Sequence, residues 1–218
     1  MPGKLIVLEG TDASGKSTQF KLLCNRLREE KCEFKTVTFP RYNEESSALI
    51  RMYLNGDFGK KPEDVNAHTA SVFFAVDRCA SYLSDWREYY QSGGLLILDR
   101  YTTSNAVHQG AKMSEEKRAE FFNWLFDLEY NLLGLPAPDH VFLLDMPISC
   151  AAELLAQREG KQIDIHEHDM GYLQQCYESA AQAAQMFSWH SIKCTENNHI
   201  RTIEDIHSEL YARVREVL

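Results

Sequence analysis

The 218-residue sequence lacks any long apolar run, since no hydrophobic stretch approaches the roughly 18 to 20 residues that a membrane-spanning helix needs. It also leaves no room for a signal peptide ahead of its first apolar run, which begins at Leu5. We therefore expect a protein without a membrane partner.

Positive charge is also scarce. The chain has 23 Lys and Arg residues against 32 Asp and Glu residues, which gives a formal net charge of −9. Affinity for nucleic acids comes mostly from lysine and arginine side chains that neutralise many phosphates. The composition thus predicts no nucleic-acid partner, whereas a small phosphorylated ligand needs only a few local cations.

Paired cysteines are the third absence. None of the cysteines shows the C-x-x-C spacing or the spacing of metal ligands. The six residues are Cys24, Cys32, Cys79, Cys150, Cys176 and Cys194. We interpret them as reduced thiols of a cytoplasmic protein, with several of them packed in the core.

The most informative stretch that is present runs from Gly10 to Ser17 and matches the spacing G-x-x-x-x-G-K-[ST] of a phosphate-binding loop. An apolar run before it predicts a buried strand, and a helical pattern follows it. Glycines in such a loop let successive amide groups turn toward one anion, at the positive end of the next helix. The alternative is a glycine turn followed by an ordinary surface lysine.

Strands and helices alternate along the rest of the chain. We predict strands at residues 4–9, 34–39, 95–98, 140–144 and 190–195. We predict helices at residues 16–30, 44–55, 62–90, 113–133, 148–157, 170–187 and 203–218. This order predicts an α/β fold with a five-stranded parallel sheet flanked by helices, in one domain that spans residues 1–218. An aromatic cluster at residues 121–126 is expected in the core or at a subunit interface.

Arginines lie near the predicted ligand crevice at the carboxyl ends of the strands, where open parallel sheets bind their ligands. They are Arg41, Arg78, Arg100 and Arg158. Guanidinium groups hold phosphate oxygens by two hydrogen bonds at once, so several of them indicate a second phosphorylated ligand that faces the first. Phosphoryl transfer between two nucleotides fits this pattern. The alternative for Arg78 is an ion pair with Asp77 or another neighbour, with Phe74 in the core.

The order and spacing of these motifs resemble the thymidylate kinase family of P-loop nucleoside monophosphate kinases, over nearly the whole chain. The motifs are Leu-Glu-Gly-Thr-Asp at 8–12, Gly-Lys-Ser-Thr at 15–18, Phe-Pro-Arg at 39–41, Asp-Arg at 77–78, Asp-Arg-Tyr at 99–101 with Ser104, Asn105 and Gln109, and Asp-Ile-His-Glu at 164–167. The nearest alternative is a deoxynucleoside kinase, because that group shares the phosphate loop and a related arginine motif. A third alternative is a regulatory protein that binds nucleotides without turnover.

The resemblance implies P-loop architecture with a short lid at about residues 158–169, transfer of the γ-phosphoryl group of ATP to dTMP, and a homodimer. ATP is expected on Gly10, Thr11, Asp12, Ala13, Ser14, Gly15, Lys16, Ser17 and Thr18. The dTMP site is expected at Asp12, Phe39, Pro40, Arg41, Phe74, Arg78, Arg100, Tyr101, Ser104, Asn105 and Gln109. Ser17 and Asp99 are the expected Mg²⁺ ligands.

By the same resemblance, Phe74 stacks on the thymine ring, and Arg78, Ser104 and Asn105 read its edge. Arg41 and Arg100 orient the acceptor phosphate. Asp12 contacts the 3′-hydroxyl group, and Tyr101 crowds the 2′ side of the sugar. The residues expected to act in catalysis are Lys16, Arg100, Asp12 and Arg158.

Arg158 is the expected lid cation because the loop interior, residues 12–14, contains no arginine. Lys161 is the alternative, and a third reading makes the segment a solvated charged loop. The chain departs from the family pattern at two positions, the first of which concerns how the sugar is screened and the second the division of labour between Arg158 and Lys161. The chain has His108 where many members have tyrosine, and Ile165 where many have a second lid arginine.

Overall fold

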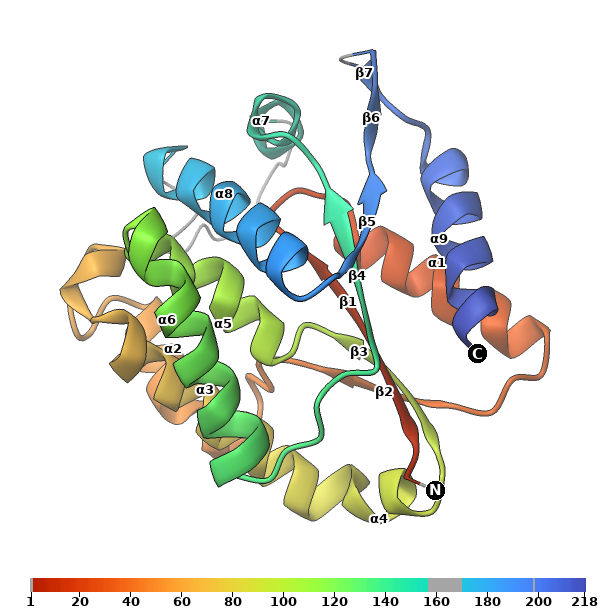
Figure 1. Cartoon of the computed structure of the whole chain (residues 1–218), viewed down its shortest axis with the longest axis horizontal. Helices are drawn as coiled ribbons and strands as arrows, with labels where there is room; N and C mark the ends of the chain where they lie inside the picture. The colour runs from red at the N-terminus through yellow and green to blue at the C-terminus, as the bar shows by residue number, and fades with distance from the viewer. Residues whose placement is uncertain (1, 157–169, 198) are drawn as a thin grey trace.

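The computed structural model describes residues 2–156, 170–197 and 199–218, and its centre is a parallel β-sheet (Figure 1). The five strands lie in the order β2-β3-β1-β4-β5, and every neighbouring pair is parallel. Their bounds are Lys4–Gly10 for β1, Lys35–Thr38 for β2, Leu95–Asp99 for β3, His140–Asp145 for β4 and His190–Lys193 for β5. The predicted α/β fold is confirmed.

The middle position of β1 follows from its apolar run, because both faces of this strand are covered. Leu5 and Val7 pack with residues of β3 in one cluster, while Ile6 and Leu8 pack with α1 and α9 in another. All four side chains are at most 1% exposed. Successive side chains of a strand point to opposite faces, so a continuous apolar run belongs in the centre of a covered sheet.

Helices cover both faces of the sheet (Figure 1). One face carries α1 (Lys16–Glu29) and α9 (Ile203–Val217), which contact each other. The other side carries α3 (Ala67–Ser81), α5 (Thr102–His108), α6 (Glu115–Phe126) and α8 (Met170–Met186). The remaining α-helices of the described residues are α2 (Ala48–Leu54), α4 (Arg87–Gln91) and α7 (Ile148–Ala156). Short 3₁₀ turns are η1 (Glu45–Ser47), η2 (Pro62–Asp64) and η4 (Gly110–Lys112).

Two of the predicted helices are interrupted by wider π-helical turns. The predicted helix at 62–90 contains η2, α3, the π turn η3 (Tyr82–Trp86) and α4. The predicted helix at 113–133 contains α6 and the π turn η5 (Asp127–Leu132). Such turns often accompany functional sites. Each of these places a large side chain in the interior, Trp86 in η3 and Glu129 in η5.

Three elements were not predicted. The segment after Arg100, for which no helix was predicted, forms α5, although its sequence Thr-Thr-Ser-Asn has low helix propensity. Burial of Thr102, Thr103 and Asn105 favours this helix over propensity. The predicted fifth strand ends two residues early at Lys193, and an antiparallel pair of short strands, β6 (Thr195–Glu196) and β7 (His199–Ile200), follows it.

The aromatic cluster on α6 belongs to the core, as one of its two predicted placements had it. Phe121, Phe122 and Leu125 are at most 1% exposed and pack with Ala183 of α8. All six cysteines are free. Over the described ranges, we find no helix with the length and apolar character to span a membrane. The predicted lid at residues 158–169, with Arg158 and Lys161, lies outside the described residues.

Candidate active site

A crevice of about 310 Å³ opens where β1, β2 and β3 end. Its walls come from the glycine loop after β1, from the segments that follow β2 and β3, and from α3 and α5. The lining residues are Asp12, Lys16, Ser17, Thr38, Phe39, Pro40, Tyr42, Leu54, Phe74, Arg78, Asp99, Arg100, Tyr101, Ser104, Asn105, His108 and Gln109. Residues of both predicted ligand sites therefore meet in one cavity.

The loop between β1 and α1 is tightly folded. The amide of Ser14 donates to the carbonyl of Thr11 at 3.2 Å. Gly15 adopts φ 81°, a left-handed conformation that favours glycine. A Cβ on Gly10 would lie 2.4 Å from Ser14 Oγ, so a side chain there would collide with the loop. This arrangement places the N-terminus of α1 beside the crevice, where helix amides and the helix dipole favour an anion.

Lys16 and Asp99 form an ion pair at the base of the crevice, with Lys16 Nζ donating to Asp99 Oδ1. Burial, together with the nearby Arg100 guanidinium, lowers the pKa of Lys16, while Asp99 and Glu9 oppose this effect. Ser17 and Thr18 are exposed at the start of α1, and Ser17 lines the crevice. Lys16, Ser17 and Asp99 therefore all line the crevice.

Arg100 connects the end of β3 to the glycine loop. Its Nη2 donates to Asp12 Oδ1 at 3.1 Å, and its Nη1 lies 3.9 Å from Glu9 Oε1. Burial disfavours the charged guanidinium, but the carboxylates of Asp12, Glu9 and Asp99 raise the pKa of Arg100 overall. The backbone of Arg100 adopts φ 67°, a conformation that is uncommon outside glycine. The guanidinium is therefore a fixed cation opposite the loop.

Glu9 is a functional candidate that was not predicted. Its side chain is fully buried, and its Oε2 accepts hydrogen bonds from Thr103 Oγ1 at 2.8 Å and Ser104 Oγ at 2.7 Å. Its Oε1 accepts from the amide of Gly10 at 3.0 Å. This carboxylate joins the glycine loop to α5. A glutamate that ends an apolar strand was the available signal for it.

Arg78 pairs with a residue far away in the sequence. Its Nε and Nη2 donate to Glu129 Oε2 and Oε1, each at 2.6 Å, and its Nη1 donates to the Tyr101 carbonyl at 3.4 Å. Glu129 also accepts from Thr102 Oγ1 at 2.8 Å. Burial disfavours the charge on Arg78, but Glu129 raises its pKa overall. Glu129 was missed because nothing in the sequence of α6 and η5 indicates an inward-facing carboxylate.

Three further predicted residues line the crevice beside Arg78. Phe74 is half-buried on the same face of α3 and packs edge-on against Tyr53. Asn105 Nδ2 donates to the Ser71 carbonyl at 3.2 Å. Gln109 is 1% exposed, and its Oε1 has no hydrogen-bond partner among the described residues. A buried acceptor without a partner on a crevice wall is a candidate contact for a ligand.

Arg41 is not among the residues that line the crevice, although its neighbours Pro40 and Tyr42 are, and its contact with the acceptor phosphate stays a prediction. Its Nε donates to Asp77 Oδ1 at 3.3 Å, its Nη1 donates to Asp85, and its Nη2 donates to Ser46 Oγ at 3.1 Å. Asp77 is almost fully buried and also accepts from the Arg41 amide at 2.9 Å. This anchor draws the guanidinium toward α3 and η3.

Tyr101 lines the crevice and is anchored in the core. The side chain is fully buried, and its hydroxyl group donates to the Pro136 carbonyl at 3.0 Å. Its ring packs against Phe39, Trp86 and Tyr130 in the core. The crowding of the sugar by the tyrosine ring stays a prediction. Its carbonyl group still contributes to the site, as an acceptor for Arg78.

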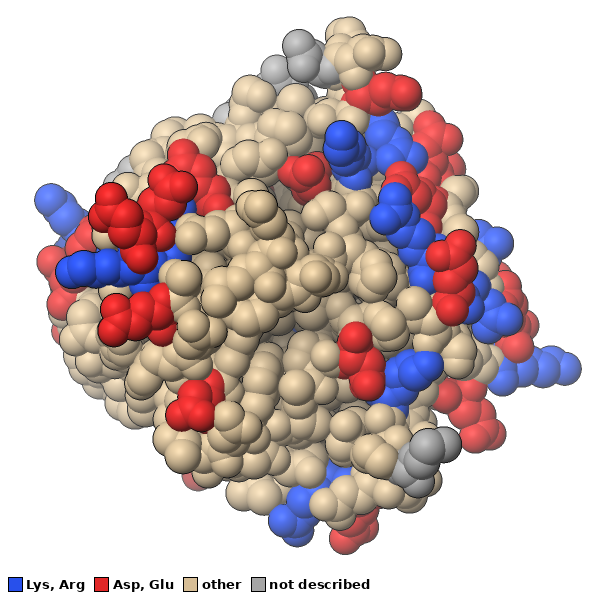
Figure 2. All heavy atoms as spheres, in the orientation of Figure 1, with Lys and Arg blue, Asp and Glu red and all other residues tan. Residues whose placement is uncertain are grey.

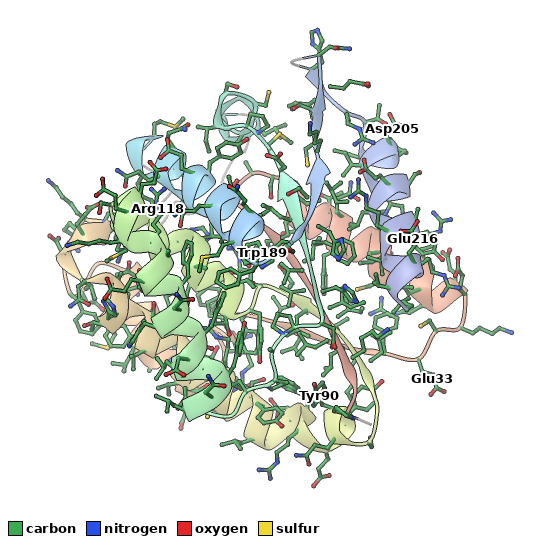
Figure 3. The ribbon with its side chains drawn as sticks, in the orientation of Figure 1. Glu33, Tyr90, Arg118, Trp189, Asp205 and Glu216 are labelled. Carbon is green, nitrogen blue, oxygen red and sulfur yellow. The ribbon has the colours of Figure 1, made fainter. Side chains whose placement is uncertain are left out.

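The turn that ends α5 is held by a side chain of α6. Arg118, labelled in Figure 3, lies on α6 near α8. Its Nε donates to the Gly110 carbonyl in η4 at 3.3 Å, and its Nη2 lies 3.8 Å from Glu178 Oε2 on α8. This side chain therefore links α6 and α8 to the turn that ends α5.

The family model for thymidylate kinase matches residues 8–209 of this chain. The chain belongs to the thymidylate kinase family. Members of this family phosphorylate dTMP to dTDP with ATP as the co-substrate. The sequence resemblance is thereby confirmed.

Individual members of the thymidylate kinase family agree with this assignment. The enzyme from Mycobacterium tuberculosis is 33% identical over 170 residues, which cover 76% of this chain and 78% of the relative. The enzyme from Plasmodium falciparum is 28% identical over 215 residues, which cover 99% of this chain and 91% of the relative. The solved thymidylate kinase from Candida albicans has a TM-score of 0.73 at 21% identity, over 99% of this chain and 92% of that chain. The last likeness shows a shared fold.

Proposed function

We propose that this chain transfers the γ-phosphoryl group of ATP to the phosphate of dTMP, giving ADP and dTDP for dTTP synthesis. The observation that carries the proposal is the 3.1 Å contact between Arg100 Nη2 and Asp12 Oδ1. It connects a cationic side chain to the glycine loop within one crevice. Two anionic substrates can therefore meet end to end there, and positioning with charge neutralisation is most of what phosphoryl transfer requires.

On the ATP side, the amides of Gly10 to Thr18 are proposed to hold the phosphates. Lys16 exchanges its partner Asp99 for oxygens of the terminal phosphates. Its lowered pKa reflects a buried site, where a positive charge interacts strongly with an incoming anion.

Mg²⁺ is the proposed metal, because hydroxyl and carboxylate oxygens are the ligands that this ion prefers. Ser17 and Asp99 supply such oxygens in the lining of the crevice. The described part of the chain holds no group of three or more His, Cys, Asp and Glu residues suited to a metal. Two protein oxygens together with nucleotide phosphates fit the usual way in which Mg²⁺ is held. When bound, the ion neutralises charge on the phosphates.

Base recognition is proposed to depend on Arg78 and Gln109. The guanidinium offers only donors and suits the 4-oxo group of thymine, while Gln109 Oε1 suits the N3–H donor. Cytosine presents the opposite pattern, with an amino donor at position 4 and an acceptor at N3. Stacking on Phe74 adds about 1–3 kcal/mol for any base, so the polar contacts must provide the selectivity.

Arg100 is proposed to orient the acceptor phosphate, with Asp12 toward the 3′-hydroxyl group as the family resemblance implies. Ser104 already donates to Glu9, so its hydroxyl group can only accept from a substrate. The glycine loop contains no arginine between its two glycines. We therefore assign the lid cation to Arg158, with Lys161 as the alternative.

The homodimer is proposed from exposed apolar side chains on neighbouring helices. Val72 and Val76 share one face of α3 and are 41% and 48% exposed. Leu83 in η3 and Leu49 and Met52 on α2 are also exposed. Apolar side chains gathered on one surface mark protein interfaces, and a second copy of this chain is the proposed partner.

The remaining assignments concern the setting of the enzyme. Six free thiols support a reducing compartment, for which we propose the cytoplasm. We also propose one kinase domain over residues 1–218. On the face drawn in Figure 2, basic and acidic side chains are interspersed, which supports nucleotides rather than nucleic acid as partners.

The test is direct identification of the product after incubation of the protein with ATP, Mg²⁺ and either dTMP or thymidine. We expect dTDP and ADP with dTMP, and almost no product with thymidine. Comparable phosphorylation of thymidine would favour a deoxynucleoside kinase. Absence of any dTMP-dependent ADP release would favour a regulatory nucleotide-binding protein.

A further inference from the structure

His108 lines the crevice at the end of α5, and neither the expected chemistry nor the proposed function uses it. Its ring bridges two parts of the molecule. Nε2 lies 2.8 Å from Nη1 of Arg100, and Nδ1 lies 3.7 Å from Sγ of Cys176 on α8. The imidazole therefore lies between the proposed phosphate-orienting arginine and a helix of the core.

The partners of the ring determine its tautomer. A guanidinium group has only donors, so Nε2 must offer its lone pair to Arg100. The ring proton is then on Nδ1, directed at Cys176 Sγ. Burial raises the pKa of Cys176 well above its usual range, so the sulfur is a neutral thiol that accepts this weak hydrogen bond. The geometry thus requires a neutral imidazole in a single tautomer.

The backbone of His108 is fixed from the same helix. Tyr172 Oη donates to the His108 carbonyl at 2.6 Å. Tyr172 and Cys176 are four residues apart, so they share one face of α8, and both are at most 2% exposed. Tyr172 holds the backbone of His108 and Cys176 contacts its ring, so buried groups set the position of Nε2.

We propose that His108 is a positioning residue that holds the Arg100 guanidinium ready for the phosphate of dTMP. Arg100 donates through Nη2 to Asp12 and through Nη1 to His108, and the Glu9 carboxylate lies farther from Nη1. A free arginine side chain loses considerable rotamer entropy when it binds an anion, and prior fixation removes part of that loss. This inference rests on the proposed function, because it assigns Arg100 to the acceptor phosphate.

The experiment compares His108→Gln, His108→Asn and His108→Phe in the full-length chain. The glutamine amide reaches the place of Nε2 and restores an acceptor for Arg100, whereas asparagine reaches only the place of Nδ1. We expect the Asn and Phe variants to raise the KM for dTMP by about tenfold, the usual effect of losing a hydrogen bond to a charged group. We expect the Gln variant to stay near the wild type, with the KM for ATP unchanged in all three.

His207→Gln is the matched control, because this half-buried histidine on α9 lies outside the crevice lining. Two-bond ¹H–¹⁵N NMR of the wild type should show His108 protonated at Nδ1 and free of a proton at Nε2. Equal dTMP KM values for the Gln, Asn and Phe variants would overturn the positioning role, as would a proton on Nε2. A wild-type chain without dTMP turnover would instead count against the proposed function, and the NMR result would still test the tautomer.

Discussion

The guanidinium of Arg78 and the carboxylate of Glu129 meet through two parallel hydrogen bonds of 2.6 Å each, with exposed side-chain fractions of 2% and 0%. The two residues lie 51 positions apart, on α3 and on the π turn η5. The pair holds Arg78 in a fixed orientation at the wall of the crevice. Removal of either partner would leave a buried charge unpaired.

Glu129→Gln should therefore both destabilise the fold and weaken dTMP binding. The neutral amide leaves the Arg78 charge uncompensated, and breaking such a buried pair costs about 3–5 kcal/mol. Urea unfolding measures the stability, and initial rates give the KM for dTMP. Asp127→Asn on the same turn is the control, because Asp127 is exposed and, among the described residues, its carboxylate accepts a hydrogen bond from Asn131 Nδ2. Unchanged stability and unchanged KM in Glu129→Gln would show that the pair has no such role.

Asp99→Asn should reduce turnover much more than acceptor binding. The Asp99 carboxylate holds Lys16 and is a proposed Mg²⁺ ligand. Without it, neither the lysine nor the metal ion is held in place beside the phosphoryl group that is transferred. Electrostatic groups of this kind contribute about 10²–10³ in kcat. Steady-state kinetics with both substrates measures the effect, and Asp205→Asn, labelled at the start of α9 in Figure 3, controls for a carboxylate outside the crevice. A variant with near-normal kcat would exclude Asp99 from the metal site.

Gln109→Leu should weaken the binding of dTMP and dUMP more than that of dCMP. The substitution removes the buried Oε1 acceptor proposed to meet the N3–H of thymine and uracil. We expect the KM for dTMP to rise about tenfold, because a buried donor of the base then has no partner. Gln182→Leu is the matched control, because Gln182 Oε1 is also unpaired among the described residues but lies away from the crevice. An equal loss for all three nucleotides would point to packing rather than base recognition.

Lys112 should make stability depend on pH in the alkaline range. Burial lowers the pKa of this ammonium group to about 8, against an opposing effect of Glu63. Its Nζ donates to Tyr53 Oη and to the Val65 carbonyl, each at 2.8 Å. Above pH 8 the unfolded chain still holds this proton while the folded chain releases it, so this residue's contribution to the free energy of unfolding rises with pH.

The measurement is urea unfolding of the wild type and Lys112→Gln at several values from about pH 7 to about pH 10. The difference in unfolding free energy, wild type minus variant, should increase across that range. Lys117→Gln, on the exposed face of α6, controls for the substitution itself. A difference that stays constant or falls would contradict the predicted protonation behaviour.

The sequence predicted the sheet and the glycine loop because both depend on local patterns. A continuous apolar run such as Leu5 to Leu8, followed directly by a glycine loop, favours a buried strand in a covered sheet. The loop motif carries its own geometry through Gly10 and Gly15. The helix α5 could not be predicted in this way, because its stability comes from buried contacts such as that between Thr103 and Glu9.

The same contrast between local patterns and long-range contacts applies to the site residues. Those fixed by a motif, such as Lys16 and Arg100, lie in the crevice as expected. The orientation of a motif side chain still depends on long-range partners, since Asp77 holds the Arg41 guanidinium and the Pro136 carbonyl accepts from the Tyr101 hydroxyl group. Glu129 and His108 acquire their places only through contacts with distant elements, which a single sequence does not display.

The most direct test of the central claim is an initial-rate comparison of dTMP, dUMP, dCMP, dGMP and thymidine as acceptors, with ATP and Mg²⁺ in excess. We expect dTMP to give the highest kcat/KM, dUMP to be the nearest competitor, and dCMP, dGMP and thymidine to release little ADP. A rate with thymidine equal to that with dTMP would contradict this claim, because the crevice would then not require an acceptor phosphate beside Arg100.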